Sequence, residues 1–472
     1  MSLFLARLLL SVRGIIIPKF LGPLEYGIYN GIFILPDYFI HFHLGSLSAL
    51  KREIPFCNGR GDFLQAQKIR NLVFTQYLGV TFIAVVLLFS STFLLGNRYS
   101  SVILICIRLV CVYIIFQAFV DAFLETLLRT DNQFDVLSKS EIFKSLGGFF
   151  FLIVLIWLWG LYGLIASFIL STFLKGSYIY YKKTYRLAWE WDYKELKRLI
   201  GIGFPIIIGV ILFALYRSID QISIIKYLGS QQLGYYALAL TLTKFLLIIQ
   251  GGAFGILEPR IYQLFGEKGD PQALKEIVLD PIGLLTLIYP LVIGLTYVGI
   301  PYVIYLFLPK YVPALTCIHI MIVGSFFYIF LEGSNSFIVA INRQNLIIWV
   351  IGLGCLVSFG IYTVLLKKNM GIEGVALGSV LVNVLAGCFF LGFILNRLFN
   401  QLREKLIVLI KIFFPFSLVV IFLILADYIW PVSGLLKKDL EVVILKGSCV
   451  IILNLPFLWK CKKKMATMMT AA

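Results

Sequence analysis

Charged side chains recur inside stretches that are otherwise apolar enough to lie within a bilayer, and these residues are the best suited to chemistry. Arg217 and Asp220 lie three residues apart in one such stretch, so a helix presents both on one face. An ionisable residue at mid-bilayer costs on the order of 2.5–3.5 kcal/mol, and such residues usually face an interior cavity. The two side chains either neutralise each other, or Arg217 binds a polar ligand and Asp220 an ion in that cavity.

A row of polar side chains follows one face of the stretch 101–127. Gln117, Asp121 and Glu125 are spaced four residues apart, which places them in line on a helix. Carboxylates in a partly desolvated bundle can exchange protons or bind Na⁺ near neutral pH. Asp121 is the deeper acid, whereas Glu125 has the alternative of reaching the interface. Glu332 is a similarly placed acid later in the chain.

Asp37 and His41 form a third candidate pair, in the stretch 28–50. Four residues apart on a helix, they share a face and can form a pH-sensitive pair. The alternative is that the histidine is a hydrogen-bonded packing residue. No third ligand stands at a suitable spacing, so we predict no metal site and no cofactor. The candidates for coupling to an ion gradient are Asp37, His41, Asp121, Glu125, Asp220 and Glu332.

Four arginines are candidates for binding an anionic ligand. Arg13 has no nearby acid in sequence, which favours a cation that faces a cavity, as we also expect of Arg217. Arg52 and Arg260 each follow an apolar stretch, at its mouth. The planar guanidinium donates two hydrogen bonds at once and therefore suits a diphosphate. For Arg52 and Arg260 the alternative is that they only orient the chain in the membrane.

The elements that carry these residues are membrane-spanning helices. The 472 residues are 60% hydrophobic and only 14% charged, which indicates an all-α integral membrane protein. The eight scattered cysteines form no metal-binding pattern and are expected to be buried free thiols. We predict about fourteen spans, at 3–20, 28–50, 71–95, 101–127, 141–159, 161–181, 199–225, 234–257, 278–308, 311–341, 345–366, 373–396, 406–430 and 441–459.

The excess of basic residues orients these spans. Of the 41 lysines and arginines, 25 fall in segments on one side of the predicted membrane and 8 on the other. The rich side is predicted to be cytoplasmic, which puts both termini in the cytoplasm. The net charge of +17 therefore reflects topology and contact with anionic lipid, and we expect no nucleic-acid partner.

An internal duplication organises the chain. Residues 21–29 read LGPLEYGIY and residues 228–236 read LGSQQLGYY, an offset of 207 that also relates Glu125 to Glu332. Further along, GLYGLIA at 160–166 corresponds to GIEGVAL at 371–377. Six spans per copy return the chain to the same side, so the copies must be parallel repeats.

The duplication defines three predicted parts. They are an N-terminal six-helix lobe (1–190), a C-terminal six-helix lobe (191–400) and two appended helices with a basic tail (401–472). We expect the charged, Trp-containing segment 182–198 to form a short interfacial helix. Glycines of the repeated element are predicted to form a tight turn or, alternatively, a gate hinge: Gly22, Gly27, Gly229 and Gly234.

No sequence motif of a catalytic domain is present. There is no P-loop, nucleophile elbow, zinc-protease or dinucleotide-binding pattern in a soluble context, so we predict a protein that is not an enzyme. The rival from the enzyme class is a membrane polymerase for polysaccharides, such as an O-antigen polymerase. That reading requires a long polar outer loop with catalytic residues, and the predicted outer loops are too short for one.

The order and spacing of several elements resemble the Wzx-type polysaccharide flippases. The resemblance rests on LGPLEYGIY after a short first span, ALKREI at 49–54, the Asp220 that precedes IIKYLGSQQLGYYALAL, and the two extra helices at the end. These proteins form the polysaccharide-transporter branch of the MOP superfamily, alongside MATE drug antiporters and lipid II flippases. The resemblance covers essentially the whole chain.

The resemblance implies a V-shaped pair of six-helix lobes with alternating access. The implied substrate is an undecaprenyl-diphosphate-linked oligosaccharide for O-antigen or capsule, moved from the cytoplasmic to the periplasmic leaflet of a bacterial inner membrane. Arg13, Arg52 and Arg217 match positions of cavity arginines, and Asp220 matches the acid of the seventh span. The chain has little sequence before the first span, so we do not expect the amphipathic entry of relatives. Implied partners are membrane lipids, a polysaccharide polymerase and chain-length machinery.

Two rival functions share this fold. A MATE-like cation or drug antiporter would favour an acidic cavity, whereas the arginines of this chain favour an anionic substrate. A lipid II flippase differs only in its substrate.

Overall fold

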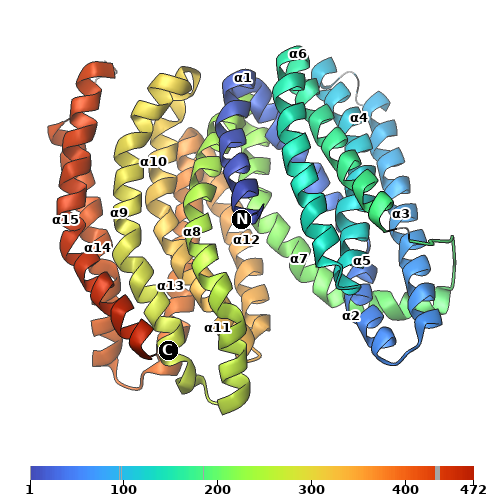
Figure 1. Cartoon of the computed structure of the whole chain (residues 1–472). Coiled ribbons are helices and arrows are strands. Elements are labelled where there is room, and N and C mark those ends of the chain that lie inside the picture. The colour runs from blue at the N-terminus through green and yellow to red at the C-terminus, as the bar shows by residue number, and fades with distance from the viewer. Residues whose placement is uncertain (1, 95, 97, 184, 431–435, 472) are drawn as a thin grey trace. The chain divides into compact units, whose positions relative to one another are not determined.

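The computed structural model describes residues 2–94, 96, 98–183, 185–430 and 436–471, and nearly all of them are helical. Within these ranges there is no β-strand, which confirms the all-α prediction for the described part. The chain divides into two compact units, Met1–Ser218 and Ile219–Ala472. Figure 1 shows the helices of both units.

The helices of the first unit begin with α1 and end within α7. Their bounds are α1 (Ser2–Phe39), α2 (Ser46–Gly59), α3 (Phe63–Leu94), α4 (Ser101–Phe116), the π-helix η1 (Gln117–Leu124), α5 (Glu125–Thr130), α6 (Phe134–Lys182) and α7 (Tyr193–Leu228). The second unit begins at Ile219, within α7. It continues with α8 (Ser230–Lys268), η2 (Pro271–Leu274), α9 (Lys275–Phe307), η3 (Pro309–Ala314), α10 (Leu315–Gly324), η4 (Ser325–Phe327), α11 (Tyr328–Ala340), α12 (Gln344–Lys367), α13 (Gly371–Leu398), α14 (Leu402–Ile429) and α15 (Leu436–Ala471).

Within the described residues, eleven helical stretches are long and apolar enough to cross a membrane. A crossing requires about 20 apolar residues. One of the eleven, α6, has 49 residues, more than twice that length. The protein is therefore a multi-pass membrane protein, although the number of helices counted this way is smaller than the predicted fourteen.

The long helix α6 is a hairpin of two antiparallel helices that reverse at Gly160 (Figure 1). Gly160 has φ 53° and ψ −126°, outside the helical region. A Cβ added to Gly163 would lie 1.8 Å from the carbonyl oxygen of Leu155, so the backbones touch directly after the reversal. The Phe143 and Tyr178 rings stack 4.7 Å apart, whereas 35 residues of straight helix would separate them by roughly 50 Å. The two arms agree with the spans predicted at 141–159 and 161–181.

A similar reversal occurs in α1 at Gly22. Arg13 donates a hydrogen bond to the Ser145 carbonyl, and Tyr29 stacks on Phe168, so both ends of the segment lie against α6. Sixteen residues of straight helix would separate Arg13 and Tyr29 by about 24 Å. Gly22 has φ 69° and ψ 174°, a conformation that is essentially restricted to glycine.

The segment that follows α6 is extended, so the predicted interfacial helix at 182–198 is wrong for its first part. Residues 183 and 185–192 are not helical, and α7 begins at Tyr193. The reason is a row of polar side chains on α3. Asn71 Oδ1 accepts from the Ala188 N–H, at 3.2 Å, and Thr75 Oγ1 accepts from the Glu190 N–H, at 3.0 Å. Backbone groups that a helix would pair internally are thus paired with α3.

Within the first unit, the first turns of α7 pack against Gly45 through a glycine of their own, Gly203. A Cβ added to Gly203 would lie 1.9 Å from the Gly45 carbonyl oxygen, and one added to Gly45 would lie 2.3 Å from the Gly203 carbonyl carbon. At the start of α7, Arg198 donates to Glu53 at 2.9 Å. The absence of two side chains allows this close approach of backbones.

We therefore expect Gly203→Ala to destabilise the protein. The methyl group would meet backbone atoms that cannot move independently, and overpacking of this kind typically costs about 1–3 kcal/mol. Gly201→Ala is a matched control, because a Cβ there meets nothing within 4 Å and alanine favours the helix by about 1 kcal/mol. Thermal unfolding of the purified proteins in detergent should show a lower Tm for G203A only. Equal Tm values for the two variants would contradict the close packing.

The last two helices, α14 and α15, pack against α9 in the second unit. Val298, Val419, Leu423 and Val450 form their shared apolar core. Beside this core, Asp427 accepts from Lys446 at 2.6 Å and from Tyr297 at 2.7 Å. The helices that have no counterpart in the predicted duplication are thus joined to the bundle by apolar contacts and by a polar cluster.

Candidate functional site: a buried lysine among three carboxylates

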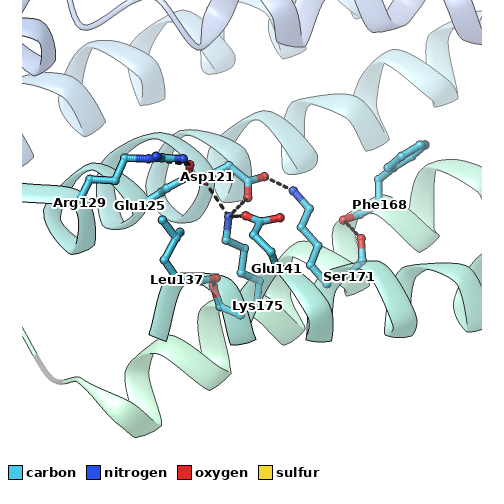
Figure 2. Close-up of polar contacts among 10 residues, drawn as sticks. Asp121, Glu125, Arg129, Leu137, Glu141, Phe168, Ser171 and Lys175 are labelled. Carbon is cyan, nitrogen blue, oxygen red and sulfur yellow. Dashed lines mark hydrogen bonds and ion pairs between the residues drawn. The ribbon is translucent and has the colours of Figure 1, made fainter. Parts of the chain in front are cut away.

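The most concentrated group of charges in the first unit surrounds Lys175, on the second arm of α6. Its side chain is only 1% exposed, and its ammonium group donates to Asp121 at 3.0 Å and to Glu125 at 2.9 Å. It also pairs with Glu141, on the first arm of α6. Figure 2 shows three carboxylates converging on the ammonium: Asp121 comes from η1, Glu125 from α5, and Glu141 from the first arm of α6. Such a charge is tolerated in an apolar bundle because its partners neutralise it.

Two further cations complete the neutralisation. Lys144 donates to the second oxygen of Asp121 at 2.6 Å, and Arg129 donates to Glu125 at 2.7 Å. Three acids thus face three bases. Because Lys144, Asp121 and Lys175 form a chain of alternating charge, loss of one group leaves an uncompensated charge on its neighbour.

A π-helix positions the acids. Residues Gln117–Leu124 form η1 between α4 and α5, and Asp121 lies within it. The wider turn, with hydrogen bonds to the fifth residue, is rare and occurs frequently at functional sites. In this protein Asp121 and Glu125 at its end both reach Lys175.

The cluster has the geometry of a cation site that already holds an ammonium group. One oxygen from each of Asp121, Glu125 and Glu141 lies within 4.8 Å of the others, a spacing that suits metal ligands. Lys175 Nζ, however, bonds to all three side chains. The Lys175 ammonium therefore occupies the position that the three carboxylates share.

A second polar network lies in the second unit, around Asp220. The carboxylate is 7% exposed and accepts from the Tyr236 hydroxyl, at 2.7 Å, and from the Gln221 N–H, at 2.7 Å. Ser379 lies 3.0 Å from the Tyr236 hydroxyl and 2.8 Å from that of Tyr362. Through these contacts the network joins the end of α7 to α8, α12 and α13.

The predicted cavity arginines are in different environments. Arg13 is partly buried, and its Nε has no hydrogen-bond partner. Arg217 is exposed and lies over the Phe213 ring, at 5.5 Å. The Arg52 side chain is 74% exposed, 3.9 Å from Glu53, and Arg260 is exposed and donates to Gln263.

The remaining predicted site residues are placed as follows. The helix that carries Asp37 ends at Phe39, and His41 lies in the turn that follows. The prediction that Asp37 and His41 share one helical face is therefore wrong. Glu332 is exposed on α11. Among the glycines, Gly229 has φ 85° and ψ 178°, close to the values of Gly22, while Gly27 and Gly234 lie in regular helix.

Sequence reasoning singled out Asp121 and Glu125 and missed the bases and the acid that they meet. Lys175, Glu141 and Lys144 all fall inside predicted spans. Their presence in apolar stretches was the available signal, because a charge inside a span normally has a partner on another helix.

Comparisons with known proteins give the same fold. Over 98% of this chain and 98% of the other, the structure matches "Lipid II flippase MurJ, inward closed conformation", with a TM-score of 0.71 at 16% identity. An inward-facing multidrug resistance MATE family transporter of the MOP superfamily matches 83% of this chain and 94% of its own, with a TM-score of 0.69 at 15% identity. The protein thus has the fold of MOP-superfamily membrane transporters, as the sequence predicted.

The family follows from the sequence itself. The model of the polysaccharide biosynthesis protein family matches residues 64–315, more than half of the chain, and the protein belongs to this family. The teichuronic acid biosynthesis protein TuaB of Bacillus subtilis is 23% identical over 231 residues, which are 47% of this chain and 46% of TuaB. The part of this chain that matches TuaB thus corresponds to less than half of the length of TuaB.

Proposed function

We propose that this protein is a flippase for undecaprenyl-diphosphate-linked oligosaccharides. It moves the lipid-linked repeat unit from the cytoplasmic to the periplasmic leaflet of a bacterial inner membrane by alternating access. The observation that carries the proposal is the combination of a polysaccharide biosynthesis family with a fold that matches a lipid II flippase along 98% of the chain.

The physical chemistry of such a substrate fits a bundle with buried charges. A sugar chain and a diphosphate cannot cross hydrocarbon unaided, since each unsatisfied polar group costs several kcal/mol. In this proposal the arginines contact the diphosphate, with Arg13 the most enclosed of them, while Arg52, Arg217 and Arg260 offer exposed guanidinium groups. The polyprenyl tail stays in lipid.

The proposal includes fourteen spans in two parallel six-helix repeats plus two appended helices. Two pairs of glycines support it. Gly22 and Gly229, which the offset of 207 relates, share φ and ψ within about 20°. Gly160 and Gly371, at the second correspondence, have φ 53° and φ 58°. The division at 1–190, 191–400 and 401–472, and the cytoplasmic position of both termini, belong to the same proposal.

Two networks are proposed as coupling groups, with an ion gradient or the membrane potential as the energy source. In the first unit, protonation or cation binding at Asp121, Glu125 and Glu141 would compete with Lys175, which occupies their shared position. In the second unit, Asp220 is the ionisable group of a buried network. Asp37, His41 and Glu332 remain candidates from the sequence.

Export of labelled glycan tests the proposed function. In a strain that lacks this gene, we expect radiolabelled undecaprenyl-diphosphate repeat units to accumulate on the cytoplasmic face, with loss of surface polysaccharide. Complementation with the gene should restore both. Normal surface glycan in the deletion strain would reject the proposal.

The second candidate is a MATE-like drug antiporter. The observation that favours it is the TM-score of 0.69 with a MATE transporter. That match covers 83% of this chain. Altered sensitivity of the deletion strain to cationic drugs, with normal surface glycan, would select this function.

A further inference from the structure

A cavity of about 380 Å³ in the second unit is lined by cations without an acid. It lies where the loop between α11 and α12 meets the last turn of α13. Arg343 and Arg397 contribute guanidinium groups, and Asn342 and Asn345 contribute amides. Neither arginine makes an ion pair with a carboxylate in the part of the chain that the structure describes. The cavity is therefore positively charged.

The first unit contains a cavity at the corresponding loop, and it shows what such a site requires. The loop between α5 and α6 contains Asn132, with φ 55°, as the loop between α11 and α12 contains Asn342, with φ 56°. In the first unit Asp131 lines the cavity, 2.6 Å from Arg70 and 3.6 Å from Lys183. There the chain supplies its own anion to the two bases.

The described residues that line the cavity of the second unit include no acid. When Asn132 is aligned with Asn342, the residue equivalent to Asp131 is Ile341. When the alignment is shifted by one residue, the equivalent residue is Asn342. Neither residue carries a charge. Arg343 and Arg397 are both exposed, so an anion from outside the chain can reach them.

The shape and chemistry of the lining favour a phosphate group. The two guanidinium groups offer planar pairs of N–H donors that suit phosphate oxygens, and each amide adds an NH2 group as a further donor. Trp349 is 71% exposed and lines the same cavity with Phe393, whose ring lies 5.7 Å from the Arg397 guanidinium carbon. An aromatic wall beside paired cations is typical of a membrane–water interface.

We propose that this cavity, which we call the Arg343–Arg397 site, binds a phosphate-bearing ligand at the basic end of the second unit. The ligand is either the phosphodiester headgroup of an anionic lipid or a free phosphate compound. The inference does not depend on the proposed substrate.

Lipid retention tests the site. Wild-type protein in nanodiscs of phosphatidylcholine with a minor fraction of phosphatidylglycerol should retain phosphatidylglycerol selectively, as measured by native mass spectrometry. Each arginine near an anionic headgroup contributes about fivefold in affinity, so Arg343→Gln with Arg397→Gln should reduce retention by more than tenfold. In the second arm of the experiment, binding of inorganic phosphate is measured on protein stripped of lipid.

Two variants make the result specific. Arg403→Gln with Lys405→Gln removes the same charge from one exposed and one half-buried position outside the cavity and should leave retention unchanged. Asn342→Asp places a carboxylate in the cavity, in imitation of Asp131, and should also reduce retention; aspartate tolerates the left-handed conformation. Size-exclusion profiles verify that each variant is folded.

The outcomes separate the two sources of phosphate. Selective retention of phosphatidylglycerol that inorganic phosphate does not displace identifies a lipid headgroup. Binding of inorganic phosphate that depends on both arginines identifies a free phosphate compound. The inference is overturned if wild type binds neither probe, or if the control pair R403Q/K405Q loses as much binding as R343Q/R397Q.

Discussion

Replacement of Lys175 by methionine is expected to unfold part of the first unit and to reduce glycan export to background. Methionine keeps the volume of the side chain but leaves Asp121, Glu125 and Glu141 facing one another without their shared cation. Removal of one partner from a buried ion pair costs about 3–5 kcal/mol. The lower figure applies here, because the three carboxylates are 13–43% exposed. Thermal unfolding in detergent and surface glycan in cells measure the two effects.

A rescue variant separates stability from transport. Glu141→Gln, added to Lys175→Met, removes the acid that has no other base, while Asp121 keeps Lys144 and Glu125 keeps Arg129, and it should recover most of the lost Tm. If the cluster couples transport to an ion, export should stay low in the rescued protein. Lys139→Met is the control, since its pair with Asp135 is exposed to solvent, which screens the interaction. Full export by the rescued variant would assign the cluster to stability alone.

Asp220→Asn is expected to lower export by about 5- to 150-fold, the range of typical coupling energies, with little loss of stability. The amide can keep every contact of the network. Its oxygen still accepts from the Gln221 N–H, while the Tyr236 hydroxyl accepts from the new amide and donates to Ser379, a direction that the present geometry allows. Only the ability to ionise is lost. Export driven by an imposed ion gradient in membrane vesicles measures the effect.

Tyr362→Phe provides the matched control for that experiment. It removes a hydroxyl from the same network at Ser379 and leaves the contacts of Asp220 in place. We expect Y362F to retain the gradient response that D220N loses. An unchanged gradient response in D220N would remove Asp220 from the coupling mechanism.

The sequence predicted the all-helical membrane bundle because hydropathy and length determine which stretches can cross, whereas the number of fourteen spans stays a prediction. It predicted the reversals at Gly22 and Gly160 too, as ends of predicted spans, because a tight turn between apolar stretches requires glycine. The extended segment 185–192 was predicted incorrectly. Its hydrogen-bond partners on α3 lie 115 to 119 residues earlier in the chain, so the local sequence cannot predict these contacts.

The candidate site was predicted only in part, for a related reason. Asp121 and Glu125 follow a helical period and could be found together. Lys175 and Glu141 reach them only through the packing of the α6 hairpin against η1 and α5. The π-helix has no sequence signal of its own, since QAFVDAFL reads as an ordinary apolar helix.

The α6 hairpin has a consequence for biogenesis. Its apex exposes Trp157 and Trp159, whereas Glu141 and Lys175 face each other across its two arms. A single charged residue raises the cost of inserting a nascent helix by about 2.5–3.5 kcal/mol, but this acid and this base meet within one contiguous stretch of chain. The hairpin can thus enter the bilayer with this acid and this base already paired, and Lys175 and Lys144 then bind Asp121 of the helix that was made before it.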